Sequence, residues 1–118
     1  MKSEKISFKG LKGVFHCFQG SNKLLSWALK NNFYIGINGM VTFSKKMKQV
    51  VKKASLENIL IETDAPYLIP EPLKRSKKWP NEPKNVKIIA EKIAEIKSDS
   101  FLNIAKVTNN NAVELFKI

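Results

Sequence analysis

The chain has 118 residues, of which 43% are hydrophobic and 26% are charged, as in an ordinary soluble globular protein. No apolar run approaches the ~18 residues that a membrane-spanning helix requires, and the N-terminal residues lack the apolar segment of a secretory signal. Cys17 is the only cysteine, which excludes an internal disulfide and fits a reducing compartment. We therefore expect a cytoplasmic protein.

The net charge of +11 is carried almost entirely by lysine, because Arg75 is the only arginine. A positive excess of this size favours polyanionic partners such as nucleic acid. However, arginine is the better residue for forked contacts to phosphates and base edges, and it is nearly absent. The charge by itself therefore carries only modest weight for nucleic-acid binding.

The first half of the chain predicts strands alternating with helices. Residues 14–18 are apolar and suit a strand, which Gln19-Gly20 breaks. Ser21 is placed to cap a helix in which leucine and alanine recur at helical spacing as far as Asn31-Asn32. Residues 33–37 then predict another strand.

The Asn38-Gly39 pair after residues 33–37 allows two interpretations. Between two apolar runs, Asn-Gly is the strongest short signal for an antiparallel hairpin. The neighbouring alternation of strands and helices instead favours a single parallel strand with Asn38-Gly39 in the loop that follows it.

Ser44 predicts the N-cap of a helix over residues 45–54, and residues 59–62 predict a short buried strand. Pro66 cannot donate to a sheet and ends this strand. The five prolines of residues 66–83 predict a long loop, and loops of this length inside a domain are usually functional.

The C-terminal third predicts helices. Pro83 suits the first helical position before an apolar face formed by Val86, Ile89, Ala90, Ile93 and Ile96. We expect Ser100 to cap a further helix whose partly inward residues are Leu102, Ala105 and Val107. A last helix over residues 111–116 is expected to place Ala112, Leu115 and Phe116 on one side. The whole pattern predicts a parallel α/β arrangement without internal repeats.

The predicted strands end in polar groups: His16, Asn38, and the pair Glu62 and Asp64. Parallel strands would bring them to one rim, where α/β proteins carry their chemistry. The two carboxylates, two residues apart on an extended strand, could address one pocket. A histidine with a carboxylate suits Zn²⁺, Mn²⁺ or Mg²⁺.

These residues could also have structural roles without binding a metal ion. Two ligands are too few, because even a catalytic zinc site keeps about three protein ligands. A lone histidine between Phe15 and Cys17 is more often a core residue than a ligand, and Asp64 could simply begin an Asx turn before Pro66.

Five stretches together resemble the TatD-type metal-dependent deoxyribonucleases in order and spacing. They are GVFHCFQGS at 13–21, YIGINGMVTF at 34–43, IETDAPYL at 61–68, NEP at 81–83 and NAVELF at 111–116. The resemblance implies an amidohydrolase-like (β/α)₈ TIM barrel whose two divalent metal ions (Mg²⁺, Mn²⁺ or Zn²⁺) serve hydrolysis of DNA phosphodiester bonds. It also favours the loop over the hairpin at Asn38-Gly39.

The resemblance implies roles for individual residues. His16 matches a metal-ligating histidine, and Asp64 matches the aspartate that contacts metal and orients or deprotonates the attacking water. Asn81 lies in the motif that opens the helix after the substrate-side loop. Arg75 in that loop would contact substrate phosphates, although an ordinary solvated basic loop explains it equally well.

The family's His-x-His pair, bridging glutamate and fifth-strand histidine have no counterpart in this sequence. Because a (β/α)₈ barrel takes ~250 residues, we interpret residues 1–118 as one segment, the C-terminal part of a barrel with about three parallel strands. We expect this segment alone to be inactive. The alternatives are a non-catalytic remnant that binds nucleic acid or a partner chain through lysines, and a related enzyme acting on another ester or amide.

Overall fold

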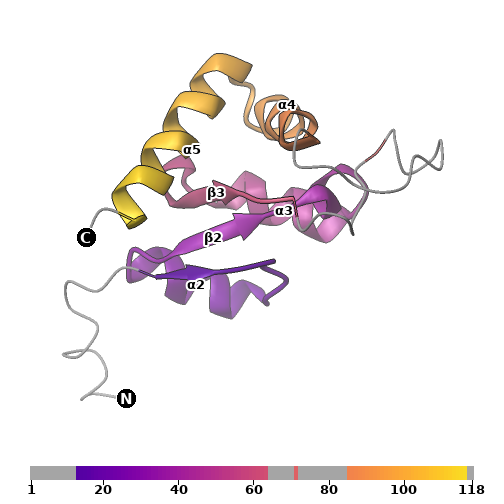
Figure 1. The fold of residues 1–118 in the computed structure, drawn as a ribbon. Coiled ribbons are helices and arrows are strands. Elements are labelled where there is room, and N and C mark those ends of the chain that lie inside the picture. Colours follow the sequence, from indigo (N-terminus) through magenta and orange to yellow (C-terminus); the bar gives the residue numbers. More distant parts are fainter. Residues whose placement is uncertain (1–12, 64–70, 72–84, 117–118) are drawn as a thin grey trace, which may run out of the picture.

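A computed structural model describes residues 13–63, 71 and 85–116 (Figure 1). The elements in chain order are β1 (Val14–Phe15), α2 (Asn22–Lys30), β2 (Tyr34–Ile37), the 3₁₀ helix η1 (Gly39–Thr42), α3 (Lys45–Lys53), the 3₁₀ turn η2 (Leu56–Asn58), β3 (Ile59–Ile61), α4 (Val86–Lys97) and α5 (Phe101–Phe116). None of the helices in the described part of the chain is long and apolar enough to cross a membrane.

The three strands form one parallel sheet in the order β1-β2-β3. Val14 pairs with Tyr34, and Ile35 pairs with Ile59. The hairpin interpretation of Asn38-Gly39 is therefore wrong and the parallel one is confirmed. Asn38 caps η1 instead of turning the chain back into an antiparallel strand.

All three strands are shorter than the sequence predicted, and β2 begins at Tyr34 rather than at residue 33. β1 stops at Phe15, because His16 and Cys17 form a turn in which Cys17 has a positive φ of 51°. β3 stops at Ile61, which leaves Glu62 just beyond the strand. These shorter strands place the polar residues in the connections at the carboxyl edge.

The serine caps predicted for α2, α3 and α5 are all present. Ser21 accepts a hydrogen bond from the Leu24 amide at 3.3 Å, and Ser44 accepts one from Met47 at 3.2 Å. Ser100 accepts one from the Asn103 amide at 3.0 Å. Each cap satisfies a helix N–H group that has no partner within its own helix.

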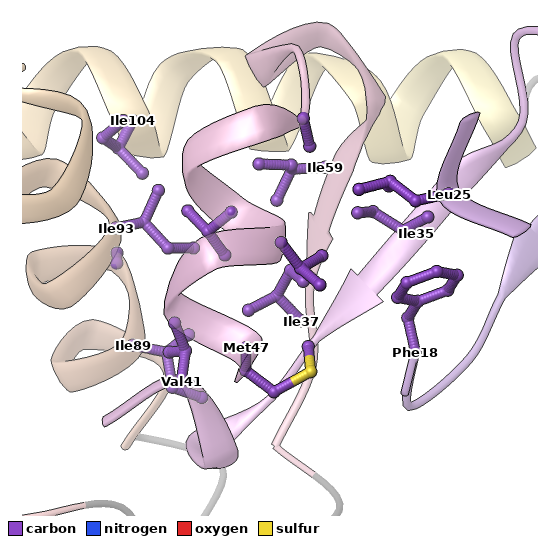
Figure 2. Packing of buried hydrophobic residues seen from close by; sticks show 14 of the residues in the cluster. Phe18, Leu25, Ile35, Ile37, Val41, Met47, Ile59, Ile89, Ile93 and Ile104 are labelled. Atoms are coloured by element: carbon purple, nitrogen blue, oxygen red, sulfur yellow. The ribbon is translucent and has the colours of Figure 1, made fainter. Parts of the chain in front are cut away.

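One face of the sheet carries the main core. Ile35 and Ile37 of β2 and Ile59 of β3 are fully buried there. Figure 2 shows these side chains meeting residues of α2, α3, α4 and α5, including Leu25, Met47, Ile89, Ile93 and Ile104. Burial of these branched side chains is the chief stabilising term of the fold.

The opposite face carries a smaller cluster. Tyr34 and Leu60 on the strands pack with Leu115 of α5, with Val14 and Ala112 at the margin. The Asn111 side chain holds α5 to this edge by donating to the carbonyls of Leu56 and Ile59 at 2.9 and 2.8 Å. In Figure 1, α5 accordingly runs beside β3.

The C-terminal region forms one helix rather than the two that the sequence predicted. The Thr108 hydroxyl donates back to the Ile104 carbonyl at 2.8 Å, so its side chain does not compete with the helical backbone. Leu102 and Phe116, expected to point inward, are 77% and 73% exposed. Ile104, Thr108 and Leu115 form the buried stripe instead.

Candidate metal centre at the strand ends

His16 and Glu62 meet at the carboxyl edge of the sheet. Nδ1 of His16, in the turn after β1, lies 3.0 Å from Oε2 of Glu62, which follows β3. The histidine side chain is 71% exposed and the carboxylate 25% exposed. The two outer strands therefore each contribute one polar group to the rim, as the parallel arrangement predicted.

The second carboxylate oxygen of Glu62 is also engaged. Oε1 accepts a hydrogen bond from the backbone amide of Cys17. Cys17 is in the left-handed region, which is unfavourable for a residue with a side chain. The contact from Glu62 therefore supports both the imidazole and the backbone turn that presents it.

The carboxylate of Glu62 reaches these partners by crossing over Gly36 in the middle of β2. A Cβ atom built on Gly36 would lie 2.5 Å from Oε1 of Glu62, well inside van der Waals contact. A glycine inside a strand weakens it and commonly marks such a close approach. Because Gly36 has no side chain, the Glu62 carboxylate after β3 can cross β2 and reach the residues that follow β1.

Asn38, after β2, contacts the turn that carries His16 and Cys17. Its side chain is buried, with Oδ1 accepting from the Met40 amide at 3.0 Å and Nδ2 donating to Sγ of Cys17 at 2.8 Å. Side-chain hydrogen bonds therefore link the carboxyl ends of all three strands. The predicted meeting of His16, Asn38 and Glu62 at one rim is confirmed.

A pocket of about 540 Å³ opens beside this rim. His16 and Glu62 border it, but most of its wall comes from β3, α4 and α5, through apolar side chains such as Leu60, Ala90 and Phe101. Its size and its mostly apolar wall are ordinary for a ligand pocket.

The described residues fit a metal ion in part. Because Nδ1 of His16 faces Glu62, its Nε2 atom is left to bind an ion, and a histidine with such a carboxylate partner is the usual arrangement in metal sites. Among residues 13–63, 71 and 85–116, no three potential ligands cluster. The carboxylate expected as the second ligand, Asp64, lies outside the described residues, as do Arg75 and Asn81.

The contacts of Glu62 were not foreseen in the sequence. The sequence predicts Glu62 at the carboxyl end of a strand, but nothing local indicates that it bonds to His16, which is 46 residues away. The one usable signal was Gly36, because a glycine within a buried strand points to a close approach from a neighbour. No pattern in one sequence names that neighbour.

Comparisons with known proteins agree with this geometry. The profile of the family described as "TatD related DNase" matches residues 1–117. A Bacillus subtilis protein named "Uncharacterized metal-dependent hydrolase YabD" is 45% identical over 108 residues, which are 90% of this chain and 41% of that protein. A "3'-5' ssDNA/RNA exonuclease TatD" from Edwardsiella piscicida is 34% identical over 109 residues, covering 89% of this chain and 42% of that protein.

Solved structures give the same result for the fold. The Escherichia coli TatD homologue YJJV matches with a TM-score of 0.83 and 26% identity over 99% of this chain and 45% of that one. A TatD family hydrolase from Entamoeba histolytica matches with a TM-score of 0.80 and 24% identity, covering 97% and 45%. The three parallel strands with their helices therefore match part of the fold of TatD-type structures.

The chain spans about two-fifths of the length of these curated relatives. A match along almost all of its residues, together with a relative at 45% identity, establishes its ancestry. The chain belongs to the TatD-related DNase family of metal-dependent hydrolases.

Proposed function

We propose that this chain supplies part of the active site of a metal-dependent hydrolase that cleaves phosphodiester bonds in DNA. The observation that carries the proposal is the contact between Nδ1 of His16 and Glu62, which leaves the other imidazole nitrogen available at the rim. Nuclease names among the relatives support nucleic acid as the substrate.

In this proposal, His16 and Asp64 hold divalent ions (Mg²⁺, Mn²⁺ or Zn²⁺), of which a complete site carries two. Such ions lower the pKa of bound water and neutralise phosphate oxygens. Asp64 also orients or deprotonates the attacking water. Arg75 and Asn81 contact the substrate backbone.

The remaining ligands would come from protein beyond these 118 residues. Within the described part of the chain, β3 pairs only with β2, and the apolar pocket runs along β3. That wall suits further strands of a barrel better than it suits open solvent. We propose that the 118 residues alone form one barrel segment without hydrolase activity.

The test is a chimera in which this sequence replaces the matching part of the Edwardsiella piscicida exonuclease. We expect the chimera to degrade labelled single-stranded DNA with Mn²⁺, and the His16→Ala and Asp64→Asn variants to be inactive while their circular dichroism is unchanged. The 118-residue chain alone should show no turnover. Near-normal activity in either variant chimera would remove that residue from the proposed site.

A second candidate function is nucleic-acid binding without hydrolysis. Helix α3 carries exposed lysines on its outer side, including Lys45, Lys46 and Lys52. Weak DNA binding by the chain alone, falling steeply with salt and lost when these lysines are replaced, would favour this candidate. A folded but inactive chimera that retains such binding would favour it further.

A further inference from the structure

Glu62 lies at the centre of the strand-end contacts, although it is not among the proposed metal ligands. Each of its carboxylate oxygens faces a different partner, Nδ1 of His16 and the backbone amide of Cys17. Gly36 lies directly beneath and leaves the carboxylate just enough space. The group is therefore held in one orientation by two contacts and a close-packed neighbour.

This orientation determines where the imidazole proton resides. A neutral imidazole carries one proton, on either Nδ1 or Nε2, and an ionised carboxylate can only accept a hydrogen bond. Facing Oε2 of Glu62, Nδ1 of His16 must be the protonated nitrogen for the 3.0 Å contact to be favourable. Nε2 then carries the lone pair, the form required for binding a metal ion.

We propose that Glu62 is a positioning residue that fixes the tautomer and ring orientation of His16, so that Nε2 is the metal-binding atom. This inference rests on the proposed function only in taking a metal ion as the ligand of Nε2. The amide of Cys17 strengthens the arrangement, because it occupies Oε1 and leaves Oε2 for the imidazole.

The Glu62→Gln variant provides a sharp test. Glutamine has one acceptor oxygen and one donor NH₂ group. The Cys17 amide is a donor, so it retains the oxygen and turns the NH₂ group towards Nδ1 of His16. Nδ1 must then accept a hydrogen bond, and the imidazole proton moves to Nε2. The variant should therefore invert the tautomer.

His16 is the only histidine in the chain, so its ring nitrogens can be observed by ¹⁵N NMR without assignment. At about pH 9, where a free imidazole is neutral, we expect protonated Nδ1 in the unmodified chain and protonated Nε2 in Glu62→Gln. Glu57→Gln is the matched control, because the Glu57 carboxylate bonds to Ser55 away from the rim. The same tautomer in the unmodified chain and Glu62→Gln would overturn the proposal.

Gly36→Ala serves as a second route if Glu62→Gln fails to fold. The added methyl group would lie against the carboxylate and displace it without changing its chemistry. We expect the fixed Nδ1–H form to give way to a mixture of tautomers. An unchanged tautomer in a folded Gly36→Ala variant would count against the proposal.

Mn²⁺ titration separates this inference from the proposed function. Paramagnetic broadening of the His16 ring signals should need about 10–100-fold more Mn²⁺ in Glu62→Gln than in the unmodified chain or Glu57→Gln. Equal Mn²⁺ dependence in all three chains would overturn the positioning role. Absence of broadening together with the expected tautomers would show that His16 binds no Mn²⁺ without the remaining ligands, and would leave the role of Glu62 in orienting His16 supported. The metal-binding function is tested separately, by the activity of the His16→Ala chimera.

Discussion

The two faces of the three-stranded sheet differ in what covers them and in what they carry. One face bears Ile35, Ile37 and Ile59, all fully buried under helices. The other bears Tyr34, Gly36 and Leu60, with a small cluster towards α5 and the Glu62 carboxylate lying over the glycine. Because successive residues of a strand alternate between faces, one short strand serves both packing and site geometry.

The alternation of side chains along the strands therefore separates the residues that stabilise the fold from those that shape the site. Changes on the helix-covered face should lower the free energy of unfolding, whereas changes beside Glu62 should mainly alter the geometry of His16. The following experiments test that separation.

The largest effect is expected for Ile59→Ala on the helix-covered face. Removing a fully buried isoleucine side chain leaves a cavity and should lower the free energy of unfolding by about 2–5 kcal/mol. Urea denaturation measures this change. Leu102→Ala, at a position that is 77% exposed, is the control and should change stability by less than about 0.5 kcal/mol. Similar losses in both variants would refute the assignment of the core.

A smaller loss is expected for Asn111→Ala, which releases α5 from the edge of β3. The variant leaves the carbonyls of Leu56 and Ile59 without their side-chain donor, at a cost of about 1–3 kcal/mol. Asn110→Ala is the matched control in the same helix, since Asn110 is exposed and alanine favours helix. Hydrogen exchange should show β3 opening more readily in Asn111→Ala alone.

Gly36→Ala tests the other face through its contact with Glu62. The new methyl group crowds the carboxylate, and overpacking of this kind costs about 1–3 kcal/mol. In a Glu62→Ala background the same substitution should cost much less, because the crowding group is gone. A double-mutant cycle in urea measures this coupling. Additive effects would show that the two residues do not compete for the same space.

The smallest effect concerns Lys97, whose Nζ donates to the Ala54 carbonyl at 2.5 Å near the end of α3. Burial lowers the pKa of this ammonium group below its ordinary value of 10.5. The unfolded chain therefore binds more protons just below pH 10.5, and the contribution of Lys97 to stability should rise with pH there. The stability difference between the unmodified chain and Lys97→Met, measured by urea denaturation at a series of pH values, should grow as pH rises towards 10.5.

The spacing of apolar residues and the residues that end helices and strands were enough to predict the approximate strands and most helices. They did not decide the parallel order, because Asn38-Gly39 also fitted a hairpin and only the family resemblance decided for the loop. Serine caps and apolar spacing are local signals, so Ser21, Ser44 and Ser100 could be assigned without a structure. The break predicted within α5 was wrong. The polar residues there bond along the helix or to β3 and do not interrupt it.

The candidate site was predictable only in outline. The parallel order brought His16, Asn38 and Glu62 to one edge, but their contacts depend on distances between residues far apart in the chain. The roles of Asp64, Arg75 and Asn81 remain predictions, since these residues lie outside the described part of the chain.

The turn after β1 also gives the molecule a natural reporter. Cys17 is the only thiol in the sequence and directly follows the only imidazole, and its Sγ accepts a hydrogen bond from buried Asn38. Because Asn38 donates to this sulfur and Glu62 holds the Cys17 backbone amide, we expect displacement of either side chain to change the accessibility of the thiol. The rate at which a thiol reagent modifies Cys17 should therefore report whether the contacts of Asn38 and Glu62 at the strand ends are intact. This measurement needs neither an introduced label nor a DNA substrate.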